Sequence, residues 1–141
     1  MNHLYSTKAT ATGGRHGAIR SDDGQLALAL ALPKSLGGPG GATNPEQLFA
    51  GGYAACFENA LLRVARESKT PLTDQDVEVT AEIGLDRNGA DAFALSAALT
   101  ITIAGLEQTQ AAYLVNRADA ICPYSNAIRG NVEVDFTINV R

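Results

Sequence analysis

The fold is decided by residues 44–68, which read NPEQLFAGGYAACFENALLRVARES. Asn44 can cap a helix, Pro45 suits its first helical position, and Gln47 can close a capping box. Residues 48–57 contain no charged side chain. A helix that is apolar around its whole circumference is buried on all sides. The stretch therefore predicts a long helix whose first half is covered everywhere, ending near Ser68.

The glycine pair of this helix and its apolar circumference both predict close neighbours. Gly51-Gly52 costs about 1 kcal/mol per residue relative to alanine inside a helix, so we expect another group to pack very near the backbone there. Pro71 follows the expected end of the helix. One small sheet from one chain offers too little cover for a fully apolar helix, and this favours a homodimer.

Strands are predicted on both sides of the helix by alternating side chains and turn residues. Before the helix they cover residues 4–12, 18–21 and 26–32. After it come strands at 77–86 and 93–103 around an Asn88-Gly89 turn, a helix at 106–121 that Cys122-Pro123 ends, and a strand at 132–140. This order predicts one α+β domain over residues 1–141, with largely antiparallel sheet around two helices.

Composition narrows the possible functions. The chain has 141 residues and a net charge of -4, so the basic surface of a nucleic-acid-binding protein is missing. The longest nearly apolar stretch, residues 26–32, is far too short to span a bilayer. The first twelve residues lack the apolar core of a signal peptide. We therefore expect a cytoplasmic protein with no membrane or nucleic-acid partner.

The chain has two cysteines, Cys56 and Cys122, and no CxxC motif. A structural disulfide is disfavoured in the cytoplasm, where the thiol pool would reduce it. Two ligands alone do not make a zinc site, so no metal or other cofactor is predicted. Two interpretations stay open on this evidence: inert core cysteines, or a transient redox pair.

A reactive Cys56 would need help from elsewhere in the chain. Burial in apolar surroundings disfavours a thiolate, and the helix dipole fades within the first turn. Arg15, which follows Gly13-Gly14, is the best candidate cation, although a surface turn arginine has the same pattern. Glu46 can hold its guanidinium by a bidentate pair or can simply favour the helix start. Cys122, at a negative helix end, is the less reactive thiol and suits a resolving partner.

Five stretches of the sequence resemble the organic hydroperoxide resistance (Ohr) proteins of the Ohr/OsmC superfamily. They are ATGGR at 11–15, LGGPGG at 36–41, TNPEQLFA at 43–50, GYAACF at 52–57 and CPYSNA at 122–127. The resemblance covers nearly the whole chain. It implies an OsmC-like fold in which two subunits intertwine as a homodimer, with the cysteine helices central and the sheets outside.

The resemblance also implies chemistry. Cys56 would attack an organic hydroperoxide, Cys122 would resolve the product as a disulfide, and Arg15 and Glu46 would assist. A lipoylated protein, or another dithiol, would be the reductant. Four aromatic side chains are candidates for an apolar pocket that favours bulky peroxides, with ordinary core packing as the alternative: Phe49, Tyr53, Phe57 and Phe93.

Three rival functions are weighed against this one. An OsmC-type peroxidase of the same superfamily is the nearest, but the glycine-rich loop and the CPYSN run favour the Ohr side. A transcriptional peroxide sensor would need a basic reading helix, which the sequence lacks. A carrier of hydrophobic ligands with inert cysteines has no use for Arg15 or Glu46.

Overall fold

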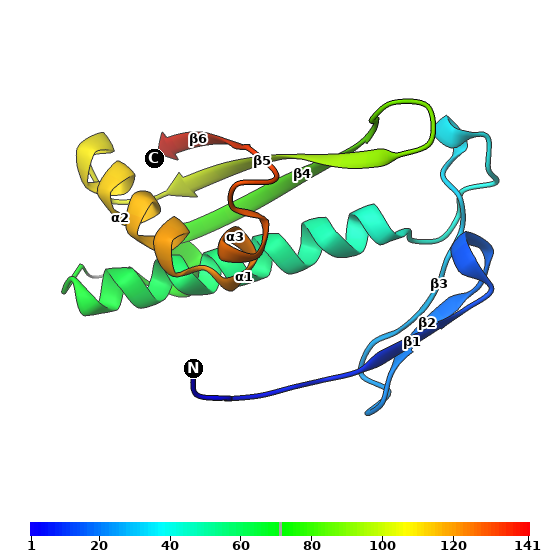
Figure 1. Cartoon of the computed structure of the whole chain (residues 1–141). Coiled ribbons are helices and arrows are strands. Elements are labelled where there is room, and N and C mark those ends of the chain that lie inside the picture. The colour runs from blue at the N-terminus through cyan, green and yellow to red at the C-terminus, as the bar shows by residue number, and fades with distance from the viewer. Residues whose placement is uncertain (71) are drawn as a thin grey trace. The chain divides into compact units, whose positions relative to one another are not determined.

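A computed structural model describes residues 1–70 and 72–141, so Pro71 lies outside the described residues. The chain divides into two compact units, Met1–Leu48 and Phe49–Arg141. The single domain expected from chain length stays a prediction. Both α and β elements are present, as predicted, and the described residues form two small sheets and three α-helices (Figure 1).

The first unit contains an antiparallel sheet of β1 (Ala9–Thr12), β2 (Ala18–Ser21) and β3 (Ala27–Ala29), in that order. Two of these strands are shorter than predicted. β3 covers only three of residues 26–32, because Leu30 leaves the sheet to form an isolated parallel bridge with Thr43. β1 likewise covers only the last four of residues 4–12.

Helix α1 (Pro45–Glu67) begins as the sequence predicts. The Asn44 side chain accepts a hydrogen bond of 2.9 Å from the Gln47 backbone N–H and so caps the helix. The reciprocal half of the capping box is not formed, because the Gln47 side chain accepts a hydrogen bond from the Thr43 hydroxyl instead, at 2.8 Å.

The second unit contains a sheet of β4 (Val77–Arg87), β5 (Phe93–Ile103) and β6 (Val134–Val140) (Figure 1). β4 and β5 form the predicted antiparallel hairpin. β6 pairs with β5 in parallel, so the expectation of antiparallel sheets is wrong at this edge. The physical reason is the connection, since α2 (Gln108–Ile121) and α3 (Pro123–Ile128) separate β5 from β6 and carry the chain back to the same end.

Helix α3 corrects a second expectation, because only two helices were predicted in the fold and none after Pro123. Pro123 ends α2 and also occupies the first position of α3, where its missing N–H costs nothing. The proline therefore separates two helices rather than a helix and a loop.

The core of the second unit lies between one face of its sheet and the helices. Alternate residues of β5 (Leu99, Ile101 and Ile103) are fully buried. Tyr53, Phe57 and Leu61 of α1 and Leu114, Val115 and Ala118 of α2 pack in the same cluster. In the single chain Gly51 and Ala55 of α1 remain exposed on the side away from this core, so cover of the helix on all sides stays a prediction that depends on a second subunit.

Candidate active site

The two cysteines meet although they lie 66 positions apart in the sequence. Cys56 lies in the middle of α1, and Cys122 lies at the junction where α2 ends and α3 begins. Their sulfur atoms are 3.9 Å apart, and neither is in a disulfide. Cys122 is fully buried and Cys56 is half-buried. Of the two thiols, Cys56 is therefore the accessible one.

A close contact between α1 and α3 brings the thiols together. The Tyr124 side chain lies on Gly52, where a Cβ atom would come within 2.7 Å of the Tyr124 hydroxyl oxygen. This confirms the predicted close neighbour at Gly52, whereas a Cβ at Gly51 would meet nothing within 4 Å. The Tyr124 ring also contacts Phe49 and Tyr53, with centroid distances of 6.0 Å and 5.9 Å.

A buried hydrogen bond joins the same two helices. The hydroxyl oxygens of Tyr53 and Ser125 are 2.7 Å apart, and either hydroxyl can donate. Both side chains are almost completely buried. The sequence analysis did not identify Tyr124 or Ser125 as site residues. The signal that could have found Tyr124 is Gly52 itself, because a helical glycine facing the partner cysteine calls for a bulky neighbour.

The surroundings of Cys56 oppose its ionisation. Burial raises the pKa of the Cys56 thiol, and the neighbouring Cys122 raises it further. A hydrogen bond from the Tyr124 backbone lowers the pKa of Cys56 and only partly compensates. The described residues of Phe49–Arg141 that shift this pKa include no cation. Within its own unit, the Cys56 sulfur therefore has a hydrogen-bond donor in the Tyr124 backbone, but no cation among the described residues that would stabilise the thiolate.

Arg15 and Glu46 form a bidentate ion pair within the first unit. The two guanidinium nitrogens of Arg15 donate to the two carboxylate oxygens of Glu46, at 2.6 Å and 2.9 Å. Gly13 and Gly14 before Arg15 have φ angles of 85° and 58°, so glycine permits the turn that presents this arginine. The hydrogen bond from Arg15 holds the pKa of the Glu46 carboxyl below its ordinary value, although burial opposes this.

The four aromatic candidates lie in different surroundings. Phe49 is half-buried beside Tyr53 and Tyr124, while Tyr53 and Phe57 are fully buried. Phe93, at the start of β5, is 64% exposed, and the Arg87 guanidinium lies 5.3 Å from its ring centroid. Phe49 and Tyr53 thus both contact Tyr124, which lies two residues after Cys122.

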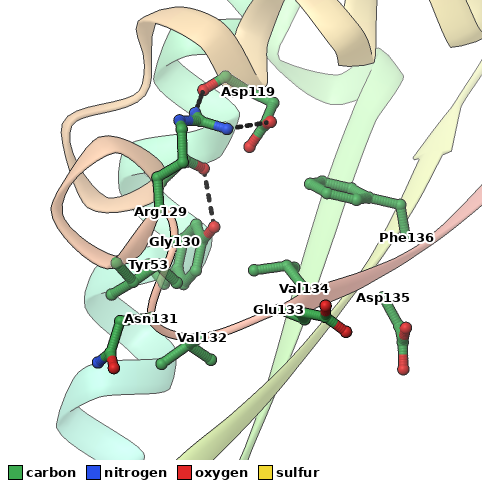
Figure 2. Close-up of a pocket in the computed structure, with 12 residues that line it drawn as sticks. Tyr53, Asp119, Arg129, Gly130, Asn131, Val132, Glu133, Val134, Asp135 and Phe136 are labelled. Atoms are coloured by element: carbon green, nitrogen blue, oxygen red, sulfur yellow. Dashed lines mark hydrogen bonds and ion pairs between the residues drawn. The ribbon is translucent and has the colours of Figure 1, made fainter.

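A cavity of about 760 Å³ adjoins Tyr53 on the second unit (Figure 2). Its wall is formed by Tyr53, Ser125, the segment 128–136 and Asp119. Figure 2 shows Arg129 bonded to Asp119 at one end and Phe136 at the other. Neither cysteine is among the residues that line this cavity.

In residues 1–70 and 72–141, no three His, Cys, Asp or Glu side chains gather as a metal site. Over the same residues, no helix is both long and apolar enough to cross a bilayer.

The chain matches known proteins over almost its full length. Residues 38–137 match the model of the OsmC-like protein family. An organic hydroperoxide resistance protein of Xanthomonas axonopodis is 43% identical, covering 96% of this chain and 94% of its own. The protein OhrB of Bacillus subtilis, also named for organic hydroperoxide resistance, is 42% identical and covers 96% and 98%. The crystal structure of an organic hydroperoxide resistance protein from Legionella pneumophila is 52% identical, with a TM-score of 0.94, covering 99% of this chain and all of its own.

The Arg15–Glu46 pair predicts a pH-dependent contribution to stability. Because the pKa of Glu46 is lower in the folded state, its contribution is complete above the ordinary value of 4.5 and is lost as the pH falls through the folded-state pKa. We expect the coupling between Glu46→Gln and Arg15→Gln in a double-mutant cycle, measured by urea unfolding, to be clear at pH 7 and to decrease progressively as the pH is lowered below 4.5. Coupling that does not change between pH 7 and the acidic end of this series would contradict the ion pair.

Proposed function

The chain belongs to the OsmC-like protein family, among its organic hydroperoxide resistance proteins, and on this basis we propose that it is a thiol peroxidase. It reduces organic hydroperoxides, of the alkyl or fatty-acid type, to alcohols, and so protects against oxidative stress. The names of the relatives support a role in organic hydroperoxide resistance. The observation that carries the catalytic part is the pair of unequally exposed thiols with sulfurs 3.9 Å apart.

In the proposed reaction the Cys56 thiolate attacks one peroxide oxygen. The O–O bond breaks, Cys56 becomes a sulfenic acid, and the alkoxide takes up a proton and leaves as an alcohol. The Cys122 sulfur then attacks the Cys56 sulfur, so that a disulfide forms and water leaves. The sulfurs must approach from 3.9 Å to about 2.05 Å, a small movement for side chains that already touch.

A dithiol closes the cycle. One of its thiolates attacks the Cys56–Cys122 disulfide, and its second thiol releases the mixed disulfide, which returns both cysteines to the reduced state. A lipoylated protein is the proposed donor. The buried position of Cys122 supports attack at the more accessible Cys56 sulfur.

Arg15 is the proposed activating cation. Peroxide reduction needs the thiolate, yet burial and Cys122 raise the pKa of Cys56, and its own unit supplies no compensating cation among the described residues. The bidentate pair with Glu46 supports Arg15 in this role, because it fixes the orientation of a guanidinium that is always charged. Phe49, Tyr53, Phe57 and Phe93 remain the proposed apolar contacts for the organic group.

A homodimer is the proposed assembly. Every residue of β1 and β3 is exposed in the single chain, although a three-stranded sheet needs a buried face to be stable. Leu28 within β3 and Leu26 just before it are exposed apolar side chains, and Gly51 and Ala55 are exposed on the helix α1. A second copy of the chain would cover these apolar positions, as the resemblance to intertwined dimers implies.

Replacing each cysteine by serine is expected to block a different step of the reaction. Cys56→Ser should abolish consumption of cumene hydroperoxide. Cys122→Ser should still form one sulfenic acid, trapped by a dimedone-type probe on Cys56, but should not form the intramolecular disulfide. Full turnover by Cys56→Ser would refute the proposed roles, and it would favour inert cysteines.

Removing Arg15 is expected to make Cys56 harder to ionise. On a Cys122→Ser background, Arg15→Ala should move the iodoacetamide alkylation curve to higher pH and slow the reaction with peroxide at pH 7 by about tenfold or more. Glu46→Ala should act more weakly, and Arg15→Lys should rescue poorly because lysine lacks the planar fork. Arg20→Ala, at an exposed arginine of the same unit, is the control. An alkylation curve unmoved by Arg15→Ala would exclude this arginine as the activator.

The assembly is tested by mass in solution. Light scattering at micromolar concentration should give twice the 14.7 kDa of one chain. Leu28→Asp places a charge on the exposed apolar side of the first sheet and should shift the mass toward that of a monomer. Thr100→Asp, at an exposed position of β5, should leave it unchanged. A 14.7 kDa species in the unmodified protein would contradict the dimer.

A further inference from the structure

The hydrogen bond between Tyr53 and Ser125 has no role in the reaction as described so far. Tyr53 lies three residues before Cys56 on α1, and Ser125 lies three residues after Cys122, inside α3. Two contacts therefore join the same pair of segments about one helical turn apart, the hydroxyls at 2.7 Å and the sulfurs at 3.9 Å. The hydroxyl pair lies at the wall of the cavity, where Figure 2 shows Tyr53 and the dashed bond that it makes.

This bond is well placed to fix the spacing of the segments. Both side chains are at most 2% exposed, so breaking the bond would leave buried hydroxyl groups without partners. Burial also raises the pKa of Tyr53, so its hydroxyl keeps its proton at neutral pH. The sulfur pair, by contrast, has only a weak thiol contact to hold it at 3.9 Å.

We propose that Tyr53 and Ser125 are positioning residues whose hydrogen bond holds Cys122 against Cys56 and so decides the fate of the oxidised Cys56. This inference rests on the proposed thiol chemistry. The Cys56 sulfenic acid has two possible reactions. Cys122 can attack its sulfur, which forms the disulfide and releases water. Alternatively, a second hydroperoxide can transfer an oxygen atom to it, which gives a sulfinic acid and an alcohol.

The distance between the sulfurs sets the competition between these reactions. Disulfide formation is intramolecular, so its rate depends on how often Cys122 lies within reach. Over-oxidation is bimolecular, so its rate rises with the peroxide concentration and does not require Cys122 to be within reach. Loosening α3 from α1 would therefore slow the first reaction relative to the second.

The test compares Tyr53→Phe, Ser125→Ala and the double variant, with Tyr113→Phe on the exposed face of α2 as a matched control. After a pulse of cumene hydroperoxide, each single variant should form the disulfide about fivefold more slowly, the factor for one net hydrogen bond. Intact mass spectrometry should show a correspondingly larger sulfinic fraction. In Ser125→Ala, which leaves the proposed substrate contacts in place, the loss of the Cys56 thiol in the first step should keep its rate. The double variant should be no worse than the more impaired single variant, because both residues act through one bond.

A second measurement needs no peroxide. Redox titration against dithiothreitol should show that each variant's Cys56–Cys122 disulfide is reduced about fivefold more readily, whereas a loss of thermal stability alone would not change this equilibrium. The inference would be overturned if both single variants kept the ratio of disulfide to sulfinic acid and the reduction equilibrium of the unmodified protein. It would also be overturned if the slowing of disulfide formation in the double variant were the sum of the two single effects. If the unmodified protein forms the disulfide in this titration but does not consume peroxide, the proposed function fails while the positioning role is still tested. If Tyr53→Phe does not fold, Ser125→Ala and its rescue by Ser125→Thr decide the question.

Discussion

The packing of Tyr124 on Gly52 is the constraint on which the rest of the site depends. Only a residue without a side chain lets the tyrosine lie this close to the helix backbone, since a Cβ would come within 2.7 Å of its hydroxyl oxygen. With α3 held there, Ser125 reaches Tyr53 and Cys122 reaches Cys56. Pro123 makes this possible, because it ends α2 and starts α3 within one residue of Cys122. A helical glycine, unfavourable for α1 alone, thus brings two distant thiols together.

The same packing disfavours the Cys56 thiolate, which the proposed reaction needs. Excluding water from the thiols raises the pKa of Cys56, and its partner sulfur raises it further. A buried cysteine pair is therefore well arranged to form a disulfide and poorly arranged to start the reaction. The proposed answer is Arg15, whose guanidinium is fixed by two hydrogen bonds to Glu46. Positioning and activation can then be altered separately.

Much of the fold could be predicted from residue spacing. The cap at Asn44, the start of α1 and the β4–β5 hairpin all follow local sequence patterns, and the structure confirms them. The parallel pairing of β6 could not be predicted, because it depends on how α2 and α3 carry the chain across the sheet. Helix α3 was missed because six residues after a proline show too little periodicity to separate a helix from a turn. At the site, the resemblance identified both cysteines. The contacts of Tyr124 and Ser125 depend on tertiary packing, and in the sequence only Gly52 indicated a close neighbour at this place.

The central claim is that one chain uses Cys56 and Cys122 as a pair to reduce an organic hydroperoxide. The most direct measurement is a single-turnover titration of the fully reduced, unmodified protein with cumene hydroperoxide, without any external reductant. The account predicts that each equivalent of peroxide consumes two thiols, yields one cumyl alcohol, and produces one peptide pair joined through Cys56 and Cys122. Loss of a single thiol per peroxide, or a disulfide that joins two chains instead, would contradict it.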